Sequence, residues 1–150
     1  MDIRQVETDK WRYRALLLLA DEQEDMEERY LDRGTMYVLF QEGEAVAQCV
    51  VTDEGGGLLE LKSLSVLPEH QKKGLGRALV QFVEETCRDG FHTLQVGTGE
   101  SPLTLPFYQK LGFVESHRVK DFFLEHYDHP IIEDGAVLTD MVYLRKKLDK

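Results

Sequence analysis

A short basic segment with two glycines carries the clearest chemical signal in this sequence. It reads PEHQKKGLGRAL at residues 68–79 and follows LLELKSLSV at 58–66, an apolar run typical of a strand. Behind it, apolar residues recur at helical spacing from Leu75 onward. The first amides of a helix lack hydrogen-bond partners, and the helix dipole adds roughly half a positive charge there. The junction between strand and helix is therefore a place where an anion can bind.

Glycines and cations within this segment indicate the kind of anion. Gly74 and Gly76 allow the backbone to approach a ligand closely and to take φ values that a Cβ disfavours. Full positive charges surround the amides, at Lys72, Lys73 and Arg77. A P-loop needs GxxxxGK[ST], which the sequence lacks, and a dinucleotide fingerprint needs a small residue where Leu79 stands. The residues predict a cradle for a phosphate or pyrophosphate that is neither of these two.

Two motifs resemble those of a known family. Residues 71–76, Gln-Lys-Lys-Gly-Leu-Gly, resemble the Q/R-x-x-G-x-G/A signature of the GNAT superfamily, the acetyl-coenzyme A-dependent N-acetyltransferases. LSVLPEHQ at 64–71 is similar to the family's strand followed by V-x-P-x-x-Q. LQVGTGESPLTLPFYQKLGF at 94–113 is similar to a second family motif, which ends in Y-x-K-x-G-F. The motifs occur in the family's order and spacing, so the chain is identified as a GNAT member.

The resemblance implies a fold and a co-substrate. The fold is α+β: a central mixed, mostly antiparallel twisted sheet, flanked by helices and splayed around the cofactor, in one acetyltransferase domain over residues 1–150. The co-substrate is acetyl-CoA. Its pantetheine arm would bind the backbone of Leu64, Ser65 and Val66, where one amide would also polarise the thioester carbonyl. Its pyrophosphate would bind the amides of Gln71, Lys72, Lys73, Gly74, Leu75, Gly76 and Arg77.

Acetyl transfer to an amine needs a base and an acid. A primary amine has a pKa of about 10.4, so its proton must be removed before attack. Glu60 lies eleven residues before Gln71, the spacing at which the histone-acetylating branch of the family places its general base. Glu60, or a water that it orders, is therefore the expected base, although it could instead pair with a cation on a neighbouring strand. Tyr108 resembles the family's general acid for the coenzyme A thiolate, although it could instead be a core tyrosine.

The sequence departs from the family pattern at Ser101. Relatives often carry Asn seven residues before the tyrosine, where it contacts the pantetheine region; this chain has Ser101, followed by Pro102. Ser101 is expected either to contact the cofactor or to cap the next helix. Pro106 would remove a backbone hydrogen bond from a helix begun at Pro102, so that helix is expected to start late or to kink.

The elements that must position these residues follow the order β-α-α-β-β-β-α-β-α-β-β. Residues 1–7 predict a strand and residues 9–33 two helical stretches that end at Gly34. The remaining elements are three antiparallel strands between 35 and 66, a helix from Leu75 to about Gly90, a strand at 91–98, a short helix at 105–111, and strands at 113–119 and 137–148. Only the unit at 58–98 requires a parallel crossover.

Composition excludes some functions. The 150 residues carry a net charge of −10, which argues against binding nucleic acid and weakly favours a cationic ligand, unless the acidity serves solubility alone. No secretory signal or apolar run of membrane-spanning length is evident, so a cytoplasmic protein without membrane attachment is expected. Cys49 and Cys87 form no CxxC pair and are expected to be buried thiols in a reducing compartment. Neither cysteine is expected to act as a nucleophile. Direct transfer of the acetyl group from acetyl-CoA to the amine is therefore preferred to a mechanism with a covalent acetyl-enzyme.

Residues 119–137 form a longer excursion than the family's last two strands require. It mixes aromatic side chains with carboxylates, the latter at Asp121, Glu125, Asp128, Glu133 and Asp134. The excursion could form one wall of the pocket that binds the amine, where its carboxylates would hold a cationic group. Alternatively, it could form the edge of a homodimer. His126 and His129 lack further apparent ligands, so no metal is expected.

The acceptor is expected to be a small amine or an amine of a protein. A non-catalytic acyl-CoA-binding or sensing domain is the alternative function.

Overall fold

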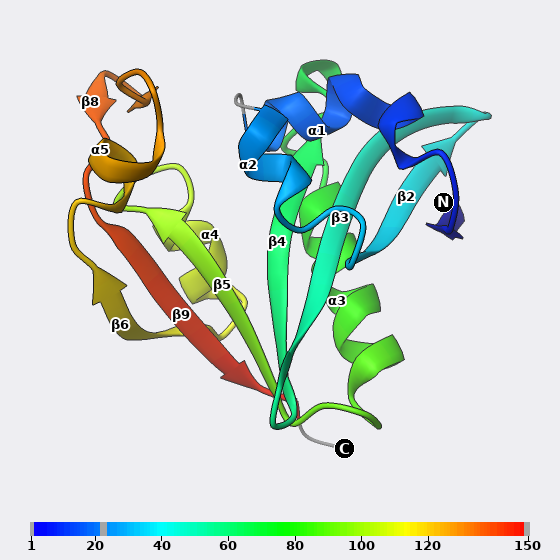
Figure 1. The fold of residues 1–150 in the computed structure, drawn as a ribbon. Coiled ribbons are helices and arrows are strands. Elements are labelled where there is room, and N and C mark those ends of the chain that lie inside the picture. The colour runs from blue at the N-terminus through cyan, green and yellow to red at the C-terminus, as the bar shows by residue number, and fades with distance from the viewer. Residues whose placement is uncertain (1, 22–23, 149–150) are drawn as a thin grey trace.

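The computed structural model describes residues 2–21 and 24–148, and a seven-stranded sheet forms its centre (Figure 1). In spatial order the strands are β1 (Asp2–Val6), β2 (Thr35–Gln41), β3 (Glu44–Gly55), β4 (Leu58–Val66), β5 (Thr93–Gly99), β9 (Met141–Lys147) and β6 (Val114–Val119). Every neighbouring pair is antiparallel except β4 and β5. The prediction of an α+β fold with a mixed, mostly antiparallel sheet is confirmed.

Helices cover both faces of this sheet. The 3₁₀ helix η1 (Lys10–Tyr13), α1 (Arg14–Ala20) and α2 (Glu24–Glu28) lie on one face, and α3 (Leu75–Cys87) and α4 (Leu105–Lys110) lie on the other. A second 3₁₀ helix, η2 (Pro68–His70), joins β4 to the segment before α3. None of the helices in the described residues is long and apolar enough to cross a membrane.

The position of α3 follows from its apolar stripe. Its buried side chains are Leu75, Leu79, Val80 and Val83, which recur at helical spacing. They pack in one core with Leu59 and Leu61 of β4 and with Leu94 and Val96 of β5. Burial of each such side chain contributes roughly 2 kcal/mol to stability. The start of α3 is thereby fixed beside the parallel strand pair.

Strands β4 and β5 separate part-way along their length. They pair in parallel only from Leu58 opposite Thr93 to Leu61 opposite Val96, although both continue further. In Figure 1 the two ribbons diverge beyond this point. The register between β3 and β4 also shifts there and leaves Lys62 without a partner on β3, a bulge that bends a strand. The predicted splay of the sheet is present.

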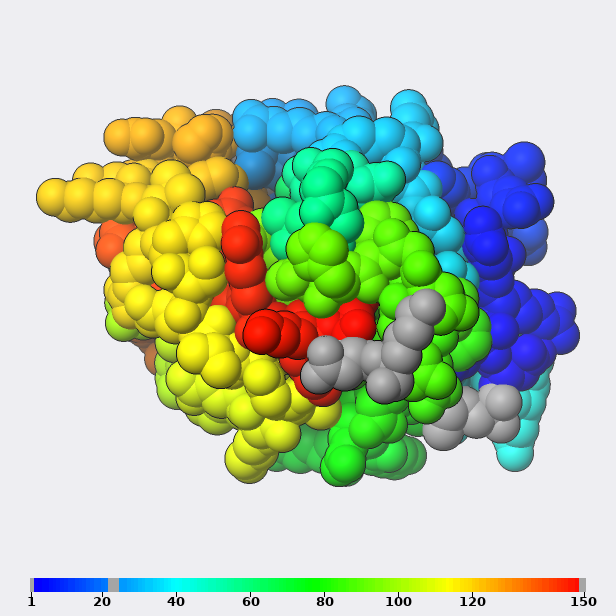
Figure 2. All heavy atoms as spheres, turned by 90° about the horizontal axis from the view of Figure 1, so that it is seen from below, coloured from blue at the N-terminus to red at the C-terminus, as the bar shows by residue number. Residues whose placement is uncertain are grey.

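The opposite end of the sheet is held together by β9. In Figure 2 its last residues (red) lie between the α3 region (green) and the segment around α4 and β6 (yellow). Lys146 of β9 forms an ion pair with Glu84 of α3 at 2.5 Å. The sequence predicted β9 as the last strand but not that it is inserted between β5 and β6. The sheet is thus continuous at one end and divided at the other.

The first helical region differs from its prediction. The pattern at residues 9–33 indicated two helical stretches, and the structure divides it further, into η1, α1 and α2. Asp9 has a left-handed φ of 53°, and Asp21 is extended with a φ of −145°, so neither continues a helix. Residues 22 and 23, which were also expected to be helical, lie outside the described residues.

The excursion, residues 119–137, has secondary structure of its own. It contains α5 (Phe122–His126) and a hairpin of β7 (Ile132–Glu133) and β8 (Ala136–Val137). The last strand of the sheet therefore begins at Met141 rather than at 137. Leu138 occupies the space that a Cβ at Gly99 would need, so it holds the end of the hairpin against β5.

Candidate active site

A cavity of about 270 Å³ lies where β4 and β5 separate. Ser63 and Leu64 of β4 face Gly97 and Thr98 of β5 across it. The C-terminal part of α1, Tyr108 of α4 and side chains of the excursion complete its wall. The cavity therefore collects residues from five regions of the chain at the point where the sheet is divided.

Tyr108 is held at this cavity by its neighbours on and after α4. It is buried, and its ring packs edge-on against Phe107 at 5.0 Å and against Phe113 at 5.5 Å between centroids. Burial raises the pKa of Tyr108, and the nearby Cys49 and Glu133 raise it further. Tyr108 therefore keeps its proton well above neutral pH.

Glu60 lies beside the cavity within a row of polar side chains. It is only 5% exposed. Its carboxylate forms an ion pair with Lys62 (2.6 Å) and accepts a hydrogen bond from Gln95 of β5 (2.5 Å). Arg145 of β9 donates in turn to Gln95 at 2.7 Å. Lys62 lines the cavity, and Glu60 is not among its lining residues. Glu60 does have a cationic partner, but Lys62 belongs to the same strand, β4, and not to a neighbouring strand as the alternative hypothesis had it.

The predicted cradle is an exposed turn at the start of α3. Gly74 caps the helix with a φ of 81°, and Lys72 also has a positive φ, 63°. The side chains of Lys72, Lys73 and Arg77 are exposed. Gln71 donates a hydrogen bond to the carbonyl oxygen of Val66 (3.1 Å) and so ties the turn to the end of β4. An exposed turn with unpartnered helix amides and three cations suits a diphosphate.

Gly76 and Leu75 of the predicted cradle differ in structure from what the sequence suggested. Gly76 lies inside α3 and has no left-handed φ, so the prediction of an unusual backbone conformation there was wrong. A Cβ on Gly76 would lie 3.4 Å from the ring of Phe107, an ordinary van der Waals contact, so packing against α4 does not by itself require glycine at this position. The side chain of Leu75 is buried in the core, so only its amide can reach a ligand.

The end of β4 presents its backbone rather than its polar side chains. Ser65 donates to the carbonyl oxygen of Leu16 (2.5 Å) and accepts from Gln48 (3.1 Å) on the α1 face of the sheet. Leu64 lines the cavity, and Val66 packs against the core. The edge of β4 that faces β5 has lost its strand partner beyond Leu61, which leaves backbone groups for a ligand.

Ser101 participates in the turn before α4. Its hydroxyl accepts a hydrogen bond from the amide of Leu103 (3.1 Å), and its carbonyl accepts from Leu105 (3.1 Å). The side chain is buried. The helix starts at Leu105 with Pro106 in its first turn, as the proline predicted. A contact between Ser101 and the cofactor stays a prediction.

Comparisons with known proteins bear on this geometry. The family model described as "Acetyltransferase (GNAT) domain" matches residues 32–115. An uncharacterized N-acetyltransferase of Bacillus subtilis strain 168, YvbK, is 38% identical over 131 residues, which are 86% of this chain and 84% of that protein. This chain belongs to the GNAT family of acetyltransferases. It is accordingly an acyltransferase.

Solved structures of GNAT proteins superpose closely. A GNAT family acetyltransferase from Elizabethkingia anophelis with acetyl-CoA bound has a TM-score of 0.92 at 30% identity and covers 97% of each chain. An acetyltransferase of Bacillus subtilis in complex with CoA has a TM-score of 0.88 at 35% identity, again over 97% of each chain. An IAA acetyltransferase from Bacillus cereus ATCC 14579 has a TM-score of 0.91 at 34% identity and covers 97% of this chain and 98% of that one.

Sequence reasoning missed several residues of this GNAT site. Lys62 and Asp21 line the cavity and had not been singled out. Tyr127 and Glu133 also line it and had been noted only among the aromatic and the acidic residues of the excursion. Asp-Gly at 134–135 is the strongest short-range signal for a hairpin turn and could have located β7 and β8. No group of three or more His, Cys, Asp or Glu side chains in the described residues could hold a metal ion.

Proposed function

We propose that this GNAT enzyme transfers the acetyl group of acetyl-CoA to a primary amine by direct attack of the amine. The observation that carries the proposal is the divided sheet: a cavity opens between β4 and β5, with the start of α3 on one side and the buried Tyr108 within. Gly76 of α3 lies against Leu64 and Phe107, neighbours of the cavity. Acetyl-CoA or CoA is bound in two similar structures, which supports the choice of co-substrate.

The residues present fit acetyl-CoA, which supplies an acetyl group already activated as a thioester. The backbone amides at the start of α3 and the exposed cations Lys72, Lys73 and Arg77 would hold its diphosphate, whereas the amide of Gln71 already donates to the carbonyl oxygen of Pro68 at 3.3 Å. The free edge of β4 at Leu64, Ser65 and Val66 would hydrogen-bond its arm. Cys49 is fully buried, and burial raises the pKa of its thiol to about 12, which favours direct transfer over an acetyl-enzyme.

Two side chains would move protons. Tyr108 would donate to the leaving thiolate, because it lines the cavity and its hydroxyl is protonated at neutral pH. Glu60, or a water that it orders, would take the proton of the amine. Since Glu60 is covered by Lys62 and Gln95, this transfer would run through a water rather than by direct contact.

The remaining parts of the proposal concern setting and acceptor. The acceptor is a small amine or an amine of a protein. Residues 1–150 act as one domain, in the cytoplasm, where both free cysteines stay reduced. Assembly as a homodimer stays a prediction.

The test is a screen of primary amines that follows release of the coenzyme A thiol, with Tyr108→Phe beside the wild type. Because a positioned acid contributes typically ~10²–10⁴-fold, we expect kcat of Tyr108→Phe to fall at least about 100-fold. Acetyl-CoA affinity, measured by calorimetry, should change less than about twofold, since the ring and its packing remain. Equal turnover of the two proteins on every accepted amine would remove the role of Tyr108. Tight acetyl-CoA binding with no amine acetylated would indicate a non-catalytic acyl-CoA-binding or sensing domain instead.

A further inference from the structure

A carboxylate of the excursion lies in the wall of the active-site cavity. Glu133 is the last residue of β7, is partly buried, and lines the same cavity as Tyr108. The carboxylate of Glu133 and the ring of Tyr108 thus share one cavity, and the negative charge of Glu133 contributes to the raised pKa of Tyr108. The carboxylate is therefore near the position where the acetyl group would be transferred.

The hairpin fixes Glu133 at this position. Ile132 pairs with Val137 and Glu133 with Ala136, and the amide of Leu138 donates to Ile131 at 2.8 Å. Both residues of the turn have positive φ, 49° at Asp134 and 79° at Gly135, as a type I′ turn requires. Such turns match the natural twist of two strands, so the backbone of Glu133 is held on both sides.

Glu133 differs from the other charged residues of the cavity in having no partner. Lys62 is paired with Glu60, and Asp21 accepts from the hydroxyl of Tyr127 with both oxygens at 3.0 Å. The side chain of Glu133 forms no hydrogen bond or ion pair with any residue that the structure describes. Burial raises the pKa of its carboxyl group, because the charged form has lost water without gaining a counter-ion. A cationic ligand would supply that counter-ion.

The wall of the cavity also carries apolar side chains beside its polar ones. Leu18 of α1, Phe123 of α5, and Ile131 and Leu138 beside the hairpin all line the cavity. Apolar side chains bind the carbon skeleton of a ligand, and a single charged group then fixes its orientation. The volume of about 270 Å³ suits a small molecule rather than a long polyamine.

We propose that Glu133 binds the ammonium group of the acceptor, and that this acceptor is a small primary amine with an apolar body. The inference rests on the proposed function and names the substrate class of the same site. Glu133 would hold the amine beside Tyr108 before the amine loses its proton. In this proposal Glu133 recognises the positive charge of the ligand. A purely structural role, in which Glu133 only shapes the cavity, would not depend on that charge.

The test compares two probes of one shape in calorimetric titrations against the enzyme saturated with coenzyme A. Benzylamine is cationic at neutral pH, and benzyl alcohol is neutral. We expect the wild type to bind benzylamine at least about tenfold more tightly, since a hydrogen-bonded charge pair contributes roughly 1.5–3 kcal/mol. Glu133→Gln should lose this preference while it keeps its affinity for benzyl alcohol. A merely structural role would weaken both probes alike.

Asp134→Asn is the matched control. It removes the same charge one residue further along, at an exposed position, and Asn tolerates the left-handed conformation of this turn. It should keep the wild-type preference. The inference is overturned if Glu133→Gln retains the preference, if both variants lose it equally, or if the wild type binds neither probe. The proposed function fails separately if the wild type binds benzylamine and coenzyme A yet acetylates no amine.

Discussion

Burial decides what Glu60 and Tyr108 can do. Both roles were predicted from the resemblance to GNAT acetyltransferases, and both side chains are almost fully buried. For Tyr108 burial raises the pKa, so the hydroxyl is protonated at neutral pH but is a weaker acid than an exposed phenol. Glu60 is buried and also forms an ion pair with Lys62. A catalytic role and a structural role therefore predict different effects when Glu60 is substituted.

Glu60→Gln separates the two roles of this residue. An amide cannot accept the proton of the amine, so we expect kcat to fall at least about tenfold. The ammonium of Lys62 loses its counter-ion, so the free energy of unfolding should fall by about 1–3 kcal/mol. Steady-state kinetics and urea unfolding measure the two effects. A loss of stability with unchanged kcat would assign Glu60 a structural role only.

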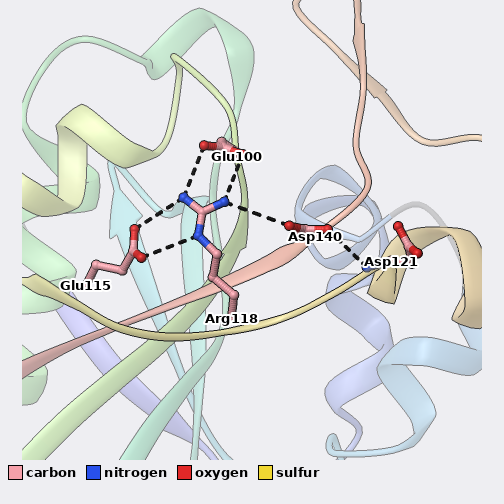
Figure 3. A network of polar contacts seen from close by, with 5 residues as sticks. All are labelled: Glu100, Glu115, Arg118, Asp121 and Asp140. Carbon is pink, nitrogen blue, oxygen red and sulfur yellow. Dashed lines mark hydrogen bonds and ion pairs between the residues drawn. The ribbon is translucent and has the colours of Figure 1, made fainter.

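At the scale of elements, the excursion is anchored at several points. Figure 3 shows Arg118 of β6 between Glu100, Glu115 and Asp140. Arg118 donates to both oxygens of Glu100 at 3.0 and 3.1 Å, and Asp140 accepts from the amide of Asp121 at 3.0 Å. Further along, Tyr127 is tied to Asp21 after α1. These contacts hold α5 and the hairpin over the cavity.

Arg118→Gln should loosen the excursion without touching the cavity. We expect KM for the amine to rise several-fold and protease cleavage within residues 119–137 to become faster, while acetyl-CoA affinity stays constant. Because the network is exposed, high salt should weaken it in the wild type and mimic the variant. Lys120→Gln removes an exposed cation nearby and serves as the control. Identical KM values in the two variants would show that Arg118 does not position the excursion.

Elements differ in how far the sequence predicts them. The apolar spacing of residues 75–83 predicts α3, since it describes one face of a helix and needs no distant partner. The excursion has no such periodicity, and α5 within it spans only Phe122–His126. Its shape depends on anchors elsewhere in the chain, such as Asp140 and Asp21, so local patterns could not give it.

For the molecule as a whole, buried tyrosines link stability to alkaline pH. Burial raises the pKa of Tyr30, Tyr108 and Tyr127, and it raises the pKa of Tyr37 to about 12. Above about pH 10, unfolded tyrosines release protons that the native state retains. The free energy of unfolding should therefore fall as pH rises from about 10 towards 12, and be unaffected by these groups below that range.

Urea unfolding at several alkaline pH values, read together with tyrosinate absorbance, measures this dependence. Tyrosinate from the buried rings should appear with unfolding and not before it. Tyr37→Phe should reduce the slope, because its ring stays packed against Phe82 while the titrating hydroxyl is gone. A stability that is flat with pH in this range would contradict the expectation.

The sequence by itself determined the family, the order of the main elements and the segment at the start of α3. These features are local: a glycine turn, a helical stripe and a strand each show their character within about ten residues. The tertiary structure alone decided which side chains meet. Gln95 reaches Glu60 across 35 positions of the chain, and Tyr127 reaches Asp21 across 106. Glu133 and Tyr108 line the same cavity only because of the strand register, the insertion of β9 between β5 and β6, and the contacts that hold the excursion against the rest of the chain. Such contacts result from packing the whole chain at once, and no short stretch of sequence contains that information.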